Sequence, residues 1–163
     1  YNTKKKKSKD RKVKADLNIE FKNYIKEPDL FSFQQRGDLW YAVNNKIYED
    51  VQILSSGLNM ILPGLCLGEN KGKDFVPNQA LALNNIFNSG AFHQVEVDWL
   101  TAIMYLRKEA LVLADQPKGY ILLTYNDIPL GFVKNIGNRA NNLYPQEWRI
   151  RSANIPQEKV EVV

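Results

Sequence analysis

Cys66 and His93 are the side chains best suited to nucleophilic chemistry, and each is the single member of its type in the 163 residues. Cys66 lies between Leu65 and Leu67 in an apolar segment, where a buried and unreactive thiol is expected. His93 follows Phe92 at the start of a predicted strand or loop, and an ordinary structural role is favoured for it. One Cys and one His also fall short of the ligands that a zinc site needs. The residues therefore predict neither a catalytic pair nor a metal site.

Nucleotide-binding signatures are also missing from the sequence. Neither G-x-G-x-x-G nor G-x-x-x-x-G-K-[ST], the two loops that cradle phosphates, occurs in the chain. Acidic pairs such as Glu49–Asp50 and Glu96/Asp98 are ordinary features of a folded domain. We therefore predict that this chain is not an enzyme by itself and binds no cofactor.

The last third of the chain carries the residues that could contact nucleic acid. Cations bind phosphates, amides read base edges, and an aromatic ring can stack on an unpaired base. An alternative stays open, in which the asparagines form turns, the aromatic rings lie in the core and the cations are a solvated face. The interleaved side chains are Lys134, Asn138, Arg139, Asn141, Asn142, Tyr144, Arg149 and Arg151.

Several short strands and two short helices would have to position these side chains. Strands are predicted within residues 58–68, 110–114, 120–125 and 130–136, with a turn at 126–127. Asn78 is a candidate cap for a helix that bears Ala80, Leu83 and Phe87 and ends at Gly90. A second helix begins at about Asp98 and is expected to turn Leu100, Ile103, Met104 and Leu106 inward. This pattern is typical of a compact mixed β-barrel in the α+β class.

A smaller unit is predicted ahead of this barrel. Asp16 can cap a helix that is stopped by Pro28. Residues 31–43 alternate about the turn Arg36-Gly37-Asp38, which indicates a hairpin, and residues 45–56 could form another short helix. We expect residues 16–56 to be a small helix–hairpin–helix subdomain.

Charge is distributed unevenly along the chain. Residues 1–14 hold eight lysines and arginines against one acid, a net charge of +7, so the rest of the chain carries −3 of the total of +4. Such a run is expected to be disordered, and to act either as a phosphate-seeking arm or as a solubilising linker. The chain begins at Tyr1 without a signal peptide, which suggests a fragment of a longer protein, and its single cysteine fits the cytoplasm. No apolar run is long enough to predict a membrane span.

Three stretches carry a family resemblance. Residues 63–69 and 71–77, followed by the Ala80–Leu83 segment, resemble the opening of the PUA-like C-terminal module of Fmu/Sun-type (RsmF-like) RNA cytosine-5 methyltransferases. Residues 124–134 look like the signature strand pair of that module, and residues 142–150 resemble its closing motif. The resemblance covers roughly residues 57–151, with a weaker likeness over 16–56.

The resemblance implies a PUA-like barrel over residues 57–163, preceded by the subdomain at 16–56 and by a basic arm or linker at 1–15. It also implies a module that positions structured RNA, rRNA or tRNA, for an upstream methyltransferase domain that binds S-adenosylmethionine. Asn141 stands where the family often has lysine, which lowers the expected positive charge. The RNA-binding candidates, which the resemblance supplies except for Arg139 on charge alone, are Lys71, Lys73, Lys134, Arg139, Asn142, Tyr144 and Arg149.

Two other functions remain open on the residues. The same fold could be a protein-interaction or intramolecular docking module, with RNA affinity mainly from the basic arm. In that case the cations should scatter, and apolar residues such as Leu143 and Trp148 should form an exposed patch. A free-standing enzyme would need a cleft with convergent titratable groups, and His93 is the residue around which such a cleft is expected.

Overall fold

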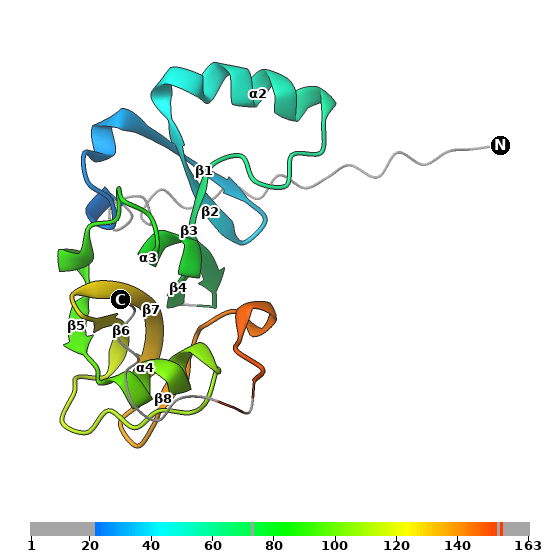
Figure 1. Ribbon diagram of the computed structural model, residues 1–163. Helices are drawn as coiled ribbons and strands as arrows, with labels where there is room; N and C mark the ends of the chain where they lie inside the picture. Colours follow the sequence, from blue (N-terminus) through cyan, green and yellow to red (C-terminus); the bar gives the residue numbers. More distant parts are fainter. Residues whose placement is uncertain (1–21, 73, 153, 155–163) are drawn as a thin grey trace, which may run out of the picture.

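The computed structural model describes residues 22–72, 74–152 and 154, and contains two four-stranded sheets with few helices (Figure 1). The first sheet has the order β1-β2-β3-β4 and the second β5-β6-β7-β8. The strands are β1 (Phe31–Arg36), β2 (Leu39–Asn44), β3 (Leu65–Lys71), β4 (Asp74–Pro77), β5 (His93–Glu96), β6 (Gly119–Tyr125), β7 (Ile128–Asn135) and β8 (Ala140–Asn142). The α-helices are α2 (Tyr48–Gly57), α3 (Gln79–Ala82) and α4 (Trp99–Leu106). Short 3-10 helices occupy Pro28–Leu30, Asn45–Ile47, Ser89–Ala91 and Gln146–Trp148.

The first sheet is an antiparallel meander. The predicted hairpin is confirmed, since β1 pairs with β2 about a turn at Gly37, which has φ +61°. The predicted helix at 45–56 is confirmed as a 3-10 turn that runs into α2. Strand β2 then pairs with β3, so both sides of the predicted boundary at residues 56/57 lie in one sheet. Asp16 and most of the helix predicted from it lie outside the described residues, as does the basic arm.

The second sheet contains one parallel and two antiparallel pairs. Strand β5 runs parallel to β6, and the connection between them includes α4. Strands β6 and β7 form the predicted hairpin, whose turn residues Asn126 and Asp127 have φ of +50° and +62°. Two positive φ angles suit the tight turns that match the twist of a hairpin, and Asn and Asp tolerate them.

A shared core joins the two sheets. Side chains alternate between the faces of a strand, so Leu122 and Phe132 point to one face of the second sheet and Ile121 and Val133 to the other. Leu122 and Phe132 belong to a buried cluster with Trp40 and other residues of the first sheet. The opposite face packs on α4. The strands thus pair within two separate sheets of a mixed α+β fold, and their closure into one barrel is not confirmed.

Three sequence-based expectations about single elements were wrong. Residues 110–114 are not a strand, because Leu111 makes only an isolated bridge to Ala140. Helix α3 begins at the predicted cap, Asn78, but ends at Ala82 instead of near Gly90. Helix α4 buries Ala102 and Tyr105, whereas Leu100 is 52% exposed and Met104 37%. Apolar residues lie all round that helix, so periodicity could not single out its buried face.

Candidate nucleic-acid interface

Lys108 ends α4 in an unusual backbone conformation. Its φ is +60°, in the left-handed region. The N–H of Lys108 donates to Tyr105 O over 2.9 Å and that of Glu109 to Met104 O over 2.9 Å, the paired hydrogen bonds of a Schellman motif. Glycine is usual at this position because a side chain costs energy there. The Lys108 ammonium donates to the backbone oxygen of Tyr144, which ties the end of α4 to the segment after β8.

Three hollows adjoin one another at Lys108. The first is a cleft of about 310 Å³ between the sheets, which Lys71 and Asn142 also line. The second, also about 310 Å³, includes Arg139, and the third, about 430 Å³, includes Arg149. The cations around them form what we call the basic surface: Lys71, Arg107, Lys108, Arg139, Arg149 and Arg151.

The basic surface has an excess of positive charge. Lys71 Nζ lies 3.4 Å from Glu69 Oε1, and Arg107 Nε lies 2.5 Å from Glu109 Oε1. The other four cations make no ion pair with any carboxylate among the residues that the structure describes. Arg139, Arg149 and Arg151 are exposed and Lys108 is partly exposed. This arrangement can attract an anionic polymer, and phosphate is the group that such cations bind best.

Lys134, one of the predicted RNA contacts, makes an ion pair within the protein. Its ammonium donates to Asp74 Oδ2 across the gap between β7 and β4, and it lies 5.2 Å from the centre of the Tyr120 ring. The hydrogen bond to Asp74 and the neighbouring Tyr120 raise the pKa of Lys134. Lys134 therefore connects the two sheets, and part of its charge is neutralised within the protein. Lys73, the other predicted cation of this region, lies outside the described residues.

Asn142 and Tyr144 act as supports for the basic surface. Asn142 Nδ2 donates to Tyr105 O over 2.8 Å and to Glu109 O over 3.1 Å, and its Oδ1 accepts from Tyr144 N over 2.9 Å. The Tyr144 ring packs edge-on against Tyr105, with ring centres 5.3 Å apart. All the hydrogen-bonding groups of the Asn142 amide are thus engaged within the chain, and they hold the end of α4 beside β8.

A buried polar network lies below the cleft. Gln79 is 5% exposed, and its Nε2 donates to Leu130 O over 2.5 Å. The hydroxyl of Tyr105 donates to Gln79 Oε1 over 3.0 Å, and burial raises the pKa of Tyr105 far above its ordinary value. Gly131 lets these groups approach, because a Cβ there would lie 2.1 Å from Gln79 Oε1 and 2.2 Å from the Tyr105 hydroxyl. The network fixes α3, α4 and β7 relative to one another.

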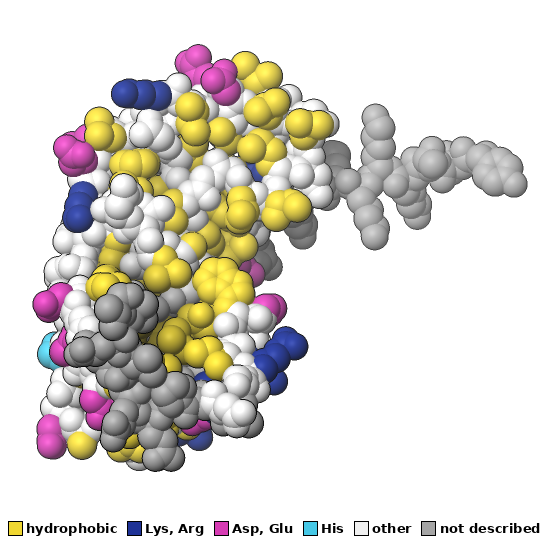
Figure 2. All heavy atoms as spheres, viewed as in Figure 1, with side chains coloured by type: hydrophobic (Ala, Val, Ile, Leu, Met, Phe, Trp, Pro, Cys, Tyr) yellow, Lys and Arg dark blue, Asp and Glu magenta, His cyan; other side chains and the backbone are white. Residues whose placement is uncertain are grey.

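Leu143 and Trp148, the two apolar residues proposed for a docking patch, have different surroundings. Leu143 lines the cleft, and Trp148 is 53% exposed and meets Tyr144 edge-on at 6.3 Å. A larger group of exposed apolar side chains lies at the start of α2, on α2 and on the segment after it, on the first sheet's side of the molecule (Figure 2). Its members are Ile47, Ile53, Leu54, Leu58, Ile61 and Leu62.

Sequence reasoning missed the central cation of this surface. Lys108 and Arg107 were absent from the candidates, although they follow directly the helix predicted from Asp98. Lysine and arginine at a helix C-terminus are favoured by the helix dipole, and this signal could have drawn attention to them. It could not have shown that this helix end lies beside Arg139 and Arg149, because that depends on the tertiary fold.

The residues considered for catalysis are not brought together. Cys66 is buried in β3, and burial raises the pKa of its thiol. His93 is exposed on β5, with its Nε2 2.8 Å from Gln116 Oε1. Over residues 22–72 and 74–152, no three His, Cys, Asp or Glu side chains are grouped so that they could hold a metal ion. None of the described helices is long and apolar enough to cross a membrane.

Comparison with known proteins gives one family. The family model described as the PUA domain of the methyltransferase RsmF matches residues 92–150, from the start of β5 to just beyond the last 3-10 helix. A search of curated proteins finds no match. The match covers the second sheet, α4 and most of the basic surface, while the resemblance noted for residues 57–91 lies outside it and stays a prediction. PUA domains are RNA-binding modules without catalytic activity. The match supports a PUA-like module, of the kind found in RsmF-type methyltransferases, over residues 92–150 of this chain.

Proposed function

We propose that the chain is the RNA-binding, substrate-positioning region of an S-adenosylmethionine-dependent RNA cytosine-5 methyltransferase. The PUA match supports an RNA-binding role. The observation that carries the proposal is the basic surface, where four cations without a described ion-pair partner surround three adjoining hollows. Structured rRNA or tRNA is the proposed ligand, and its phosphates would lie along Lys108, Arg139, Arg149 and Arg151.

The rest of the proposal concerns a longer polypeptide, the complete methyltransferase of which this chain would be one part. An upstream catalytic domain would supply the cysteine nucleophile and bind S-adenosylmethionine, so no residue of the present chain would take part in the chemical step. The basic arm at residues 1–15 would connect the two parts and add phosphate contacts that do not depend on RNA sequence. The enzyme would work in the cytoplasm, where its RNA substrates are.

The proposal is tested by RNA binding across a salt series. A structured ribosomal RNA fragment is titrated with the chain, and fluorescence anisotropy gives the slope of log affinity against log salt. The double substitution Arg149→Ala/Arg151→Ala removes two phosphate contacts and should make the slope less steep by about 1.4–1.8. Lys46→Ala, an exposed lysine in the first sheet's 3-10 turn, removes one charge elsewhere and should leave the slope unchanged.

A second polypeptide that begins at Ala15 separates the arm from the folded body. If it retains binding that depends on Arg149 and Arg151, the folded body recognises RNA by itself. If binding disappears with the arm and the double substitution has no effect, the proposed surface is wrong.

Intramolecular docking is a second candidate function, favoured by the exposed apolar group on α2 and residues 58–62. Ile61 is 83% exposed and Ile53 69%, and several exposed apolar side chains over one stretch of chain are a feature of interaction surfaces. Under this function, Ile53→Asp/Ile61→Asp should lower the melting temperature of the longer polypeptide while leaving that of the present chain unchanged. Equal melting temperatures with and without the substitutions in the longer polypeptide would count against docking at this patch.

A further inference from the structure

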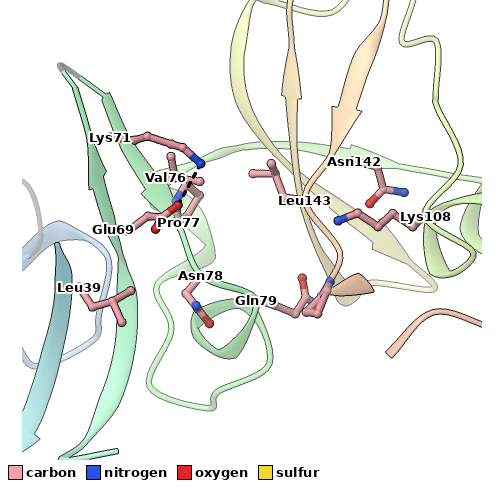
Figure 3. A pocket seen from close by; sticks show the side chains of 11 residues that line it. Leu39, Glu69, Lys71, Val76, Pro77, Asn78, Gln79, Lys108, Asn142 and Leu143 are labelled. Atoms are coloured by element: carbon pink, nitrogen blue, oxygen red, sulfur yellow. Dashed lines mark hydrogen bonds and ion pairs between the residues drawn. The ribbon is translucent and has the colours of Figure 1, made fainter. Parts of the chain in front are cut away.

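The cleft between the two sheets has two facing walls, and each wall carries both charged and apolar side chains (Figure 3). Lys71 and Glu69 come from β3 on one side, and Lys108 from the end of α4 on the other. The two ammonium groups therefore lie on opposite walls. The volume of about 310 Å³ is at the lower end of the range of small-molecule sites, roughly 300–1,000 Å³.

Apolar side chains line the space between these cations. Val76 and Pro77 of β4 form part of one wall, and Leu143 and Pro145, which follow β8, form part of the other. Apolar side chains on two facing walls can hold a planar ring between them. A base pair within a duplex could not enter a space of this size, whereas a single unstacked base could.

Most of the polar groups in the cleft are already used by the protein. The amides of Gln79 and Asn142 are engaged in internal hydrogen bonds. Asn78 differs from them: its Oδ1 accepts from Ala80 N over 2.9 Å, while its Nδ2 donates to no group among the described residues. Asn78 Nδ2 can therefore donate to a ligand, and the carboxylate of Glu69 can accept from one.

We infer that this cleft holds one unpaired nucleotide of the bound RNA. The base lies between the apolar walls, with Asn78 and Glu69 as hydrogen-bonding partners for its edge. Lys71 and Lys108 bind the phosphates on either side of it. This inference rests on the proposed function and goes beyond it, because it adds recognition of an unpaired base to general attraction of phosphates. Sequence-specific recognition of RNA usually depends on such unpaired bases.

The test compares two RNA hairpins that differ only in one bulged nucleotide. The chain should bind the bulged hairpin about tenfold more tightly than the fully paired one, the difference expected from burying one base. Asn78→Asp keeps an oxygen that caps Ala80 N but replaces the free donor with a negative charge. This variant should lose the tenfold preference and keep its affinity for the paired hairpin within about twofold.

Asn84→Asp is a matched control. Asn84 Oδ1 accepts from Ile86 N over 3.1 Å, the same local role as that of Asn78, but Asn84 lines a different hollow that shares no residue with the cleft. This control should keep the preference for the bulged hairpin. A third variant, Val76→Trp, fills the cleft and should also abolish the preference, and melting temperatures show whether all three variants remain folded.

Each outcome distinguishes the inference from the proposed function. Equal affinity of the unsubstituted chain for both hairpins would overturn the nucleotide site and leave RNA binding intact. The same conclusion would follow if Asn78→Asp and Asn84→Asp weakened the preference equally. Failure of the unsubstituted chain to bind either hairpin would overturn the proposed function itself.

Discussion

Lys108→Gly should separate RNA binding from stability. Lysine at a left-handed φ of +60° costs about 1 kcal/mol relative to glycine. The substitution relieves that cost but loses the hydrogen bond from the ammonium to Tyr144 O, which contributes about 0.5–1.5 kcal/mol. The two effects nearly cancel, so the free energy of unfolding should change by less than about 1 kcal/mol.

RNA binding should respond much more clearly. Removal of one phosphate contact makes the slope of log affinity against log salt less steep by about 0.7–0.9. The loss of affinity between 50 and 200 mM salt should therefore be about threefold smaller for Lys108→Gly than for the unsubstituted chain. Fluorescence anisotropy gives the slope, and urea denaturation gives the free energy of unfolding.

The substitution Lys46→Ala provides the comparison. It removes a lysine that is far along the chain from the basic surface and exposed on the first sheet's side. Equal changes in slope for Lys108→Gly and Lys46→Ala would refute the placement of RNA at the end of α4. A loss of several kcal/mol in Lys108→Gly would refute the stability argument instead, because it would mean that the Lys108–Tyr144 hydrogen bond outweighs the backbone cost.

Three further substitutions test the supports of the surface. Gly131→Ala should lower the free energy of unfolding by about 3 kcal/mol in urea denaturation, because its Cβ would displace the buried Gln79–Tyr105 hydrogen bond. Asn142→Ala should cost about 2 kcal/mol in the same assay, since it removes the side-chain donor of Glu109 O and leaves Tyr105 O with the N–H of Lys108 as its donor. The Asp98 carboxylate caps α4, and its hydrogen bonds with Thr101 lower its pKa. Stability from this charge is present above the ordinary pKa of 3.8 and is lost as pH falls through the lowered pKa, so thermal melts of Asp98→Asn should lack this acid-dependent loss.

Local signals predicted the elements that depend on neighbouring residues. The hairpin at Gly37, the turn at Asn126–Asp127, the cap Asn78 and the start of a helix near Asp98 were all recognisable, because each depends on residue types within a few positions. The length of α3 was not, since Asn84 and the residues after it turn away from the helix through contacts with the segment at Tyr24 and Ile25.

The candidate site was predicted less completely than the fold. Arg139 and Arg149 were recognised from charge and resemblance, and they lie on the basic surface. The sequence does not indicate that Lys134 donates a hydrogen bond to Asp74, 60 positions away. It also does not indicate that the Asn142 side chain donates to a backbone carbonyl of α4. Both facts depend on how the two sheets face each other, which a single sequence does not encode locally.

The shared core has a consequence for how this chain can be divided. Leu122 and Phe132 of the matched segment are fully buried against Trp40 and Leu67, which lie outside it. Exposing two such side chains to water costs about 1.5–3 kcal/mol each. Residues 92–150 on their own would thus expose a hydrophobic surface to solvent and tend to aggregate. The two sheets should melt in a single cooperative transition, so the unit that folds is larger than the segment that matches the PUA family model.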